Sequence, residues 1–233
     1  LNFQPELKSQ SFVIEGLDGS GKETQTKLLC EALSSRKIAF QKISFPDYQN
    51  PSSSLVRMYL NGDFGNQPGD VNAYAASSFY AVDRFASYRR YWKKAYDRGD
   101  LIIADRYTTS NLVFQLPKVE KEKWGEFLKW LEDYEYEKLG LPKPDLTFYL
   151  EMPEEVSEQL LNERYHGDES QKDIHEKDCS FQHACRESAA FAAQTLKWQI
   201  IHCVENGRLR TPEEIHREMA EKIDKEFSAY AII

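Results

Sequence analysis

Short apolar runs recur along the chain and alternate with longer stretches whose apolar residues follow helical spacing. The runs that have the length of a strand are residues 11–15, 38–45, 101–104, 146–150 and 198–204. Strands that alternate with helices favour a parallel sheet covered by helices on both faces. We therefore predict a three-layer α/β fold around a central five-stranded parallel sheet.

The intervals between these runs have helical patterns. They cover residues 22–36, 53–60, 71–98 and 110–140. A final amphipathic helix begins at the start signal Thr211-Pro212-Glu213-Glu214. No internal repeat or low-complexity linker interrupts the chain, so we interpret residues 1–233 as a single domain.

One segment, about residues 162–178, departs from this alternation because it is almost wholly polar. Such a composition is compatible with a surface loop. It is equally compatible with a mobile lid that closes over a phosphate site and brings basic side chains to it.

Composition and charge narrow the class of protein. Apolar residues make up 41% of the chain and charged residues 29%, which is ordinary for a globular domain. No apolar run approaches the roughly 20 residues that span a bilayer, and residues 1–10 lack a secretory-signal pattern, so we expect a cytoplasmic protein. The net charge of −8 and the lack of a long basic block argue against binding to a nucleic-acid polymer. Small phosphorylated ligands stay possible because a few local donors suffice to hold them.

Cysteine and histidine usage does not indicate a metal site. The four cysteines form no C-x-x-C pair, and the five histidines are scattered. Free thiols are therefore expected rather than a zinc site or a disulfide framework.

Gly16-Leu17-Asp18-Gly19-Ser20-Gly21-Lys22 has the Gly-x-x-x-x-Gly-Lys frame of a phosphate-binding P-loop. Glycines allow successive backbone N–H groups to face phosphate oxygens, and the start of the next helix adds positive potential. Lys22 would reach the β- and γ-phosphates. A strand precedes the loop and a helix follows it, as this interpretation requires. We assign to ATP binding Gly16, Leu17, Asp18, Gly19, Ser20, Gly21, Lys22, Glu23 and Thr24.

Glu23 departs from the P-loop pattern, in which a Ser or Thr that ligates Mg²⁺ follows the lysine. Two readings stay open: Thr24 serves the metal, or carboxylates and the ATP itself hold it. Asp105 closes the third strand and is well placed for Mg²⁺, through water. Arg106, the next residue, offers a planar fork for a phosphate group.

In combination, these motifs resemble the thymidylate kinase family over nearly the whole chain. The most specific match is Asp105-Arg106-Tyr107-Thr108-Thr109-Ser110-Asn111. The other matching pieces are the P-loop with its acidic Asp18, Phe45-Pro46, Tyr80-Ala81-Val82-Asp83-Arg84, and residues 142–145.

The resemblance implies that the protein transfers a phosphoryl group from MgATP to dTMP. It also implies roles for individual residues. Tyr80 would stack on thymine, and Arg84 would hydrogen-bond the base. Asp18 would accept from the sugar 3′-hydroxyl, and Arg106 would hold the acceptor phosphate. Ser110 and Asn111 would lie near the base, and Tyr107 or Phe114 would crowd the 2′ position. Phe45 is a further residue expected at the substrate.

The chain departs from the family pattern at two places. An Arg commonly follows Phe45-Pro46, but this chain has Asp47-Tyr48, and Arg57 is a possible substitute. The P-loop also lacks the basic residue that some members carry. The resemblance then implies a catalytic Arg from the lid, for which Arg164 is the candidate, ahead of Lys172 and Lys177. Family members are homodimers that pack through the long helix near Tyr80.

Other functions stay open at this stage. They are a kinase for another pyrimidine nucleotide or a nucleoside, a P-loop regulatory NTPase, and an inactive homologue that only binds nucleotide. Tyr80, Arg84 and Asn111 favour a thymine-like base.

Overall fold

The computed structural model describes residues 9–168 and 172–227. A central parallel sheet has the strand order β2-β3-β1-β4-β5. Its strands are β1 (Ser11–Glu15), β2 (Phe40–Ser44), β3 (Leu101–Asp105), β4 (Leu146–Glu151) and β5 (Gln199–His202). A short antiparallel hairpin of β6 (Val204–Glu205) and β7 (Arg208–Leu209) follows β5.

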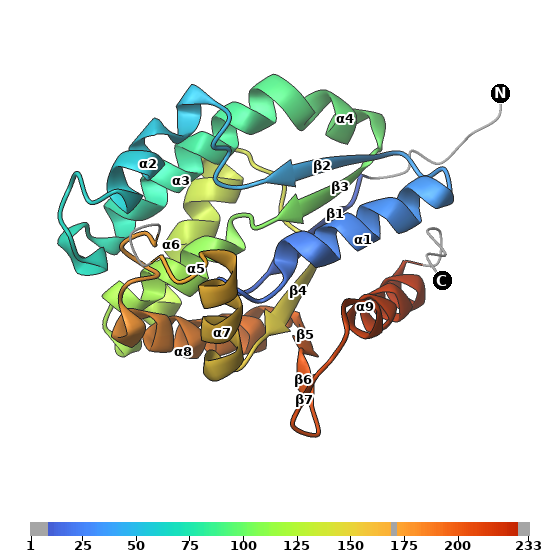
Figure 1. Ribbon diagram of the computed structural model, residues 1–233. Helices are drawn as coiled ribbons and strands as arrows, with labels where there is room; N and C mark the ends of the chain where they lie inside the picture. Colours follow the sequence, from blue (N-terminus) through green and yellow to red (C-terminus); the bar gives the residue numbers. More distant parts are fainter. Residues whose placement is uncertain (1–8, 169–171, 228–233) are drawn as a thin grey trace.

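Helices cover both faces of the sheet, as Figure 1 shows. They are α1 (Lys22–Ser35), α2 (Ser54–Leu60), α3 (Ala73–Ser87), α4 (Lys93–Arg98), α5 (Thr109–Gln115), α6 (Trp124–Glu132), α7 (Glu154–Arg164), α8 (Cys179–Leu196) and α9 (Pro212–Glu226). Two π-helical turns, η3 (Tyr88–Trp92) and η6 (Asp133–Lys138), continue α3 and α6. The short 3₁₀ turns are η1 (Pro51–Ser53), η2 (Pro68–Asp70), η4 (Leu116–Lys118) and η5 (Lys121–Lys123).

Alternation along β1 divides the core between the two faces. Phe12 and Ile14 are fully buried in the cluster that packs under α1 and α9. Val13 points the other way, into a cluster with Tyr88 and Trp92 from the α3–α4 side. Every residue of β1 is buried, which is the expected state of a central strand in a parallel sheet.

The strand register brings three strand ends together. Asp105 at the end of β3 lies opposite Ile14 of β1 and Ser44 of β2. The carboxyl ends of the strands, and the loops that follow them, therefore share one edge of the sheet. Ligands bind at this edge in open α/β folds.

The predicted sheet and final helix are confirmed, but several bounds differ. The second strand was expected from residue 38, yet Ile38 N–H still donates to Leu33 of α1 and the strand begins at Phe40. The expected fifth strand, 198–204, ends at His202, and Val204 pairs in the hairpin instead. Thr211 caps α9 through a reciprocal pair of hydrogen bonds with Glu214, as predicted.

Two expected helices are interrupted. The helix expected over 71–98 starts at Ala73, with Asn72 as its cap, and passes through the π-helical turn η3. The stretch 110–140 breaks after α5, because Pro117 cannot donate to an α-helical hydrogen bond and the chain forms η4 there.

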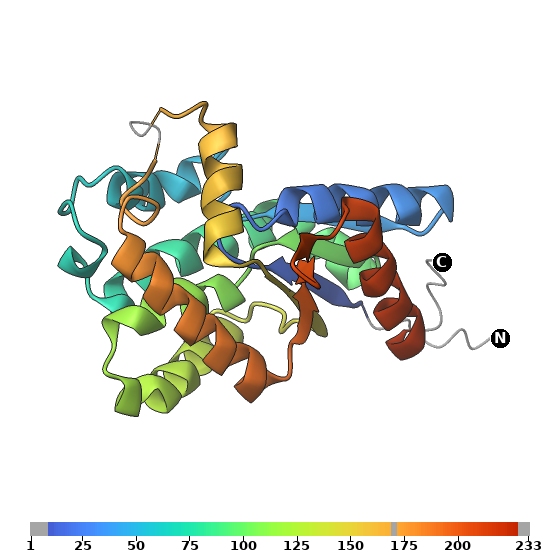
Figure 2. The same ribbon diagram turned by 60° about the horizontal axis from the view of Figure 1, so that its bottom comes forward.

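The segment expected as a lid, about 162–178, begins within the last turn of α7. Figure 2 shows α7 rising beside the start of α1, with the following segment running toward α2 before α8 begins. The Ile174 N–H group donates to the Leu60 carbonyl of α2 at 3.3 Å. Residues 169–171 of this segment lie outside the described part of the chain.

Candidate active site

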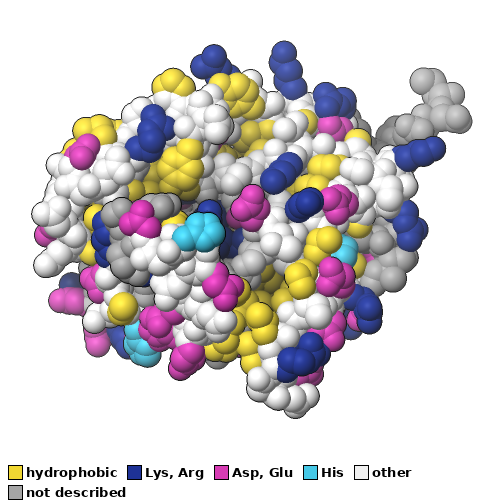
Figure 3. Space-filling view, in the orientation of Figure 1, with side chains coloured by type: hydrophobic (Ala, Val, Ile, Leu, Met, Phe, Trp, Pro, Cys, Tyr) yellow, Lys and Arg dark blue, Asp and Glu magenta, His cyan; other side chains and the backbone are white. Residues whose placement is uncertain are grey.

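Two connected cavities lie at the carboxyl edge of the sheet. The larger is a cleft of about 1070 Å³ that runs along the P-loop. The smaller is a narrow pocket of about 80 Å³ beside it. Asp18, Phe45, Tyr48 and Arg106 line both cavities, so the two are continuous. On the face that Figure 3 shows, basic and acidic side chains are interspersed.

The P-loop has the backbone that its sequence predicts. Gly19 and Gly21 have φ values of 76° and 84°, in the left-handed region that glycine adopts without strain. Lys22 is the first residue of α1, and its Nζ donates to the Leu17 carbonyl at 2.7 Å. Burial, together with the nearby Arg106 charge, lowers the pKa of Lys22 to about 8.

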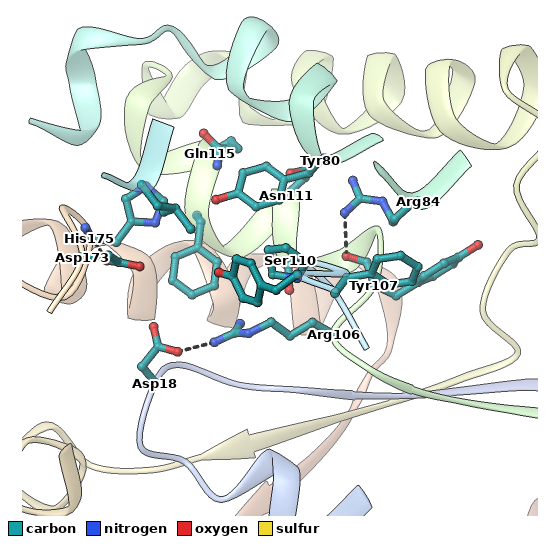
Figure 4. Close-up of a pocket in the computed structure, with 15 residues that line it drawn as sticks. Asp18, Tyr80, Arg84, Arg106, Tyr107, Ser110, Asn111, Gln115, Asp173 and His175 are labelled. Atoms are coloured by element: carbon teal, nitrogen blue, oxygen red, sulfur yellow. Dashed lines mark hydrogen bonds and ion pairs between the residues drawn. The ribbon is translucent and has the colours of Figure 1, made fainter. Parts of the chain in front are cut away.

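Arg106 lies at the junction of the cleft and the pocket. Its backbone φ is 63°, an unusual value for a residue with a side chain, and such values cluster at functional sites. Its guanidinium donates to Asp18 at 2.6 Å and to Glu15 at 3.2 Å, and lies 4.9 Å from the centre of the Phe114 ring. The contact with Asp18 is drawn in Figure 4.

Electrostatic effects at this junction favour the charged forms of Asp18 and Arg106. Burial raises the pKa of Asp18, but the charges of Arg106 and Lys22 outweigh it, so the net shift of this pKa is downward. Burial lowers the pKa of Arg106, and the charges of Asp18 and Glu15 raise it above its usual value. Both groups are therefore ionised at neutral pH.

Glu15 was missed by the sequence analysis although it organises this junction. Its carboxylate is fully buried and accepts from Thr109 at 2.9 Å and from Ser110 at 2.7 Å, besides Arg106. An acidic residue directly after the apolar run Phe12–Ile14 was the available signal. The contact also engages the Ser110 hydroxyl, which was expected near the base.

The small pocket gathers the side chains expected at the nucleoside, as Figure 4 shows for those it labels. Its walls include Phe45, Tyr80, Arg84, Tyr107, Ser110, Asn111 and Phe114. The Tyr107 hydroxyl donates away from the pocket, to the Pro142 carbonyl at 3.0 Å. Phe114 lies between Arg106 and His175, and its ring is parallel to the imidazole within 9°.

Arg84 is buried rather than free, with only 1% of its side chain exposed. Its Nε and Nη2 donate to the two carboxylate oxygens of Glu135 at 2.7 and 2.6 Å. Nη1 donates to the Tyr107 carbonyl at 3.3 Å. Burial lowers the pKa of Arg84, but the Glu135 charge outweighs this effect and the pKa rises, so the guanidinium stays charged.

Other pocket residues were not found from the sequence. Gln115 is fully buried, and neither its amide nitrogen nor its amide oxygen has a partner among the described residues. It lies one helical turn after Asn111 on α5, so helical spacing from the motif would have found it. Asp173 and His175 reach the pocket from the polar segment, where nothing in the sequence pattern singled them out.

Of the residues expected near ATP and the metal, all but Gly16 and Leu17 line the cleft, and Leu17 is instead buried in the core. Glu23 and Thr24 are exposed at the start of α1, and Asp105 lines the same cleft from the end of β3. Arg164 also lines the cleft, in the last turn of α7, and Arg57 lines it from α2. Of the two weaker lid candidates, Lys177 is exposed and Lys172 is partly buried.

The described residues assemble neither a preformed metal cluster nor a membrane span. Within residues 9–168 and 172–227, no three His, Cys, Asp or Glu side chains are grouped so as to hold a metal ion. No helix in the same part of the chain has the length and apolar character needed to cross a membrane.

Comparisons with known proteins all point to one family. The family model described as thymidylate kinase matches residues 14–219. A thymidylate kinase of Mycobacterium tuberculosis is 28% identical over 205 residues, which cover 84% of this chain and 93% of the relative. One from Danio rerio is 24% identical over 210 residues, which cover 89% of this chain and 86% of the relative.

A solved structure supports the fold. The thymidylate kinase of Candida albicans superimposes with a TM-score of 0.69 at 23% identity, covering 94% of this chain and 92% of that one. The family model agrees with the geometry of the site, which combines a P-loop cleft with a connected pocket beside the Tyr80–Arg84 helix. The chain belongs to the thymidylate kinase family, a membership that implies ATP-dependent phosphorylation of dTMP to dTDP.

Proposed function

We propose that this chain transfers the γ-phosphoryl group of MgATP to dTMP, and that the dTDP formed serves dTTP synthesis. The observation that carries the proposal is the position of Arg106, where the P-loop cleft meets the pocket lined by Tyr80, Arg84 and Asn111. A phosphate group at this junction would join a nucleoside in the pocket to a triphosphate in the cleft.

The cleft is assigned to ATP. The P-loop amides and Lys22 would hold the β- and γ-phosphates, with Gly19 and Gly21 giving the backbone its curvature. Gln25, on the next turn of α1, donates to the Pro212 carbonyl at 2.9 Å and so ties the cleft wall to α9. The cleft volume of about 1070 Å³ is at the upper end of ligand sites and accommodates a nucleoside triphosphate.

Mg²⁺ fits the donor set of this cleft. Asp105, Thr24 and Glu23 present the oxygen ligands that Mg²⁺ prefers. Because no described group of three ligands is assembled, the ion would bind together with the ATP phosphates. When bound, Mg²⁺ would neutralise charge on those phosphates.

The pocket is assigned to dTMP. Tyr80 would stack on the thymine base, which is worth roughly 1–3 kcal/mol in comparable sites. Arg84, Asn111 and Gln115 offer hydrogen-bonding groups for the edge of the base. Of the two residues expected against the 2′ position, Phe114 is the better supported, because the Tyr107 hydroxyl is directed to Pro142.

Catalysis would consist of alignment and charge neutralisation. Arg106 would hold the acceptor phosphate, with Asp18 orienting both the guanidinium and the sugar 3′-hydroxyl. Arg164, at the cleft wall, would approach the transferring group and would exclude water together with the rest of the lid segment. Asp18 and Asp105 would position groups rather than act as bases, since the acceptor phosphate is already an anion.

The proposed enzyme is a homodimer. Its support is an apolar surface on α2 and α3 that includes Leu55, Met58, Val82 and Phe85. Among the aromatic residues of α3 and η3, Phe85 and Tyr91 are exposed, whereas Tyr88 lies in the core.

The test is ADP formation from MgATP with dTMP, dUMP, UMP, dCMP or thymidine as separate acceptors. We expect kcat/KM for dTMP to exceed every other value by at least about tenfold, or about 1.4 kcal/mol. Arg106→Ala should reduce dTMP turnover by about 100-fold or more, because a charge-assisted phosphate contact is lost. The matched control, Arg98→Ala, removes an exposed Arg on α4 and should leave turnover unchanged.

Two results would reject the proposal in different ways. A clear preference for another acceptor would change the substrate but keep the kinase. ATP binding without turnover of any acceptor would favour a regulatory or purely binding protein.

A further inference from the structure

A buried carboxylate outside the motifs contacts two of the residues assigned to the base. Glu135 belongs to the π-helical turn η6, and its side chain has no exposed surface. It accepts two hydrogen bonds from Arg84, at 2.7 and 2.6 Å, and a third from Asn111 Nδ2 at 2.9 Å. Segments far apart in the sequence, α3, α5 and η6, therefore meet at one carboxylate.

Stability alone does not account for this arrangement. Burying an Arg–Glu pair costs desolvation energy, and an apolar pair of similar volume is often as stable or more stable. What the pair provides is a fixed direction for its partners. Both Arg84 and Asn111 line the small pocket, so the direction of their polar atoms decides what the pocket can bind.

The contacts determine the orientation of the Asn111 amide. Its Nδ2 donates to Glu135 and also to the Ser77 carbonyl at 3.3 Å, and both of these groups can only accept. Turning the amide over would place its oxygen against two acceptors. The atom that Asn111 offers to a ligand is therefore its oxygen, which accepts no hydrogen bond from the described residues.

Arg84 offers the opposite kind of group. Nε donates to Glu135, but Nη1 and Nη2 have more hydrogens than the contacts with Tyr107 and Glu135 use. The pocket thus has a donor from Arg84 and an acceptor from Asn111. A thymine or uracil ring is complementary, because its O4 accepts and the adjacent N3–H donates. Cytosine has an amino group and an unprotonated N3 at these places, so both contacts would fail.

We propose that Glu135 is a positioning residue that makes the pocket selective for 4-keto pyrimidines over 4-amino pyrimidines, by fixing the Asn111 amide and the Arg84 guanidinium together. This inference rests on the proposed function, which assigns Arg84 and Asn111 to the base. Glu135 itself does not touch the substrate in this arrangement.

Glu135→Gln tests the proposal at nearly constant volume. One of the two carboxylate oxygens becomes an NH₂ group. In place of Oε1 it would meet donors of both Arg84 and Asn111, and in place of Oε2 it would meet Arg84 Nε. In the first case the Asn111 amide turns over and offers its NH₂ group to the base, and in the second the Arg84 guanidinium loses its fixed direction. We expect the ratio of kcat/KM for dTMP to that for dCMP to fall at least about tenfold, because buried polar groups that face the base are then misdirected. The change should appear in KM for dTMP, with KM for ATP unchanged.

Glu137→Gln is the matched control. Glu137 lies two residues away on the same π-helical turn, but its side chain is exposed. The same chemical change there should leave the dTMP-to-dCMP ratio unaltered.

Glu135→Asp keeps the counter-charge for Arg84 and serves if the Gln variant does not fold. Its carboxylate is one methylene shorter, so it cannot reach both partners, and the ratio should fall by a smaller factor of about three to ten. A folded variant that loses activity on dTMP and dCMP equally, with the ratio unchanged, would overturn the proposal and leave Glu135 a structural role. Wild-type enzyme without dTMP turnover would instead refute the proposed function.

Discussion

His175 is buried beside the small pocket, although most of the residues around it in the sequence are polar. Its ring is stacked with Phe114 and lies 4.9 Å from the ring centre of Phe181. One ring nitrogen, Nε2, is 2.7 Å from the Tyr59 hydroxyl, which also contacts Lys118. Burial, with the nearby Lys118 charge, lowers the pKa of His175 to about 3, so the imidazole is neutral in the folded protein.

The neutral imidazole makes stability depend on pH. The unfolded chain takes up a proton on this residue near pH 6.5, whereas the folded protein does so only near pH 3. The contribution of His175 is therefore fully present above pH 6.5 and is lost as pH falls from 6.5 toward 3. We expect wild type to lose about 1–2 kcal/mol of unfolding free energy relative to His175→Phe between pH 7.5 and pH 5. Denaturant unfolding at each pH measures this difference.

Wild type must be compared with His175→Phe because another group changes the stability in the opposite direction as the pH falls. Burial, followed by the charges of Asp18 and Glu176, raises the pKa of Asp173 to about 7, so its stabilising effect increases on acidification. Asp173 is present in both proteins and cancels in the difference. His183→Phe, at an exposed position on α8, should follow wild type. Parallel curves for wild type and His175→Phe would contradict a buried neutral imidazole.

At the scale of elements, the P-loop and α7 are in direct contact. A Cβ atom on Gly19 would lie 2.7 Å from the Ser157 carbonyl oxygen and 3.1 Å from Leu161 Cγ, both on α7. The backbone φ of 76° adds strain for any side chain there. Glycine at this position thus lets the helix after β4 pack against the phosphate loop.

Gly19→Ala should therefore separate these two elements. We expect a loss of about 1–3 kcal/mol in unfolding free energy, and ATP affinity lower by at least about tenfold, because the loop amides move. Thermal unfolding and the binding of a fluorescent ATP analogue measure the two effects.

Two other glycines separate crowding from backbone strain. Gly21 has a φ of 84°, but a Cβ atom there would have no neighbour within 4 Å, so Gly21→Ala should cost only about 1 kcal/mol. Gly125 is the second residue of α6 and has open space around it, and Gly125→Ala should stabilise by about 0.5–1 kcal/mol. Equal effects of the Gly19 and Gly21 variants would show that the contact with α7 is unimportant.

The sequence predicted the elements whose apolar residues are large and regular. The strands β1, β3 and β4, the helix α1 and the capped helix α9 all lie close to their predicted bounds. No element was predicted for α7 or α8. In α7 most residues are polar, and α8 buries small residues such as Ala189, Ala192 and Ala193, which give a weak hydrophobic pattern.

The candidate site was predictable where one motif carries it. Most residues of the P-loop line the cleft, and Asp105, Arg106, Tyr107, Ser110 and Asn111 of the second motif line the cleft or the pocket. Glu135 and His175 come from other segments and reach the pocket only through the tertiary fold. The sequence around Glu135 does not distinguish it from Glu137. Only the tertiary fold does so, because it buries Glu135 against Arg84 and leaves Glu137 exposed.

At the scale of the whole molecule, the outer surface of α2 and α3 carries large apolar residues. Val82 is 40% and Phe85 37% exposed on α3, and Leu55 and Met58 are 40% and 38% exposed on α2. Several large apolar side chains on adjoining helices are more than scattered surface residues, and such patches mark association surfaces. A face used identically by two copies gives a two-fold symmetric dimer.

Val82→Glu should therefore convert the proposed homodimer into a monomer. Two copies would place their introduced charges near each other on an apolar, partly desolvated face, at a cost of several kcal/mol. Sedimentation velocity at micromolar concentration measures the change. The control Gln194→Glu introduces the same charge at an exposed position of α8, which packs on the other side of α5 from α3, and should leave the dimer intact.

Kinase activity measures what the dimer contributes to binding of dTMP. α3 carries Tyr80 and Arg84 toward the pocket, whereas Val82, between them in sequence, points outward. Packing against a second copy would hold this helix in place, so a folded Val82→Glu monomer should show a higher KM for dTMP with little change in KM for ATP. A monomeric wild-type protein with full activity would contradict the dimer. It would leave the assignment of α3 to the base untouched, because the dimer surface and the base-binding residues lie on opposite faces of this helix.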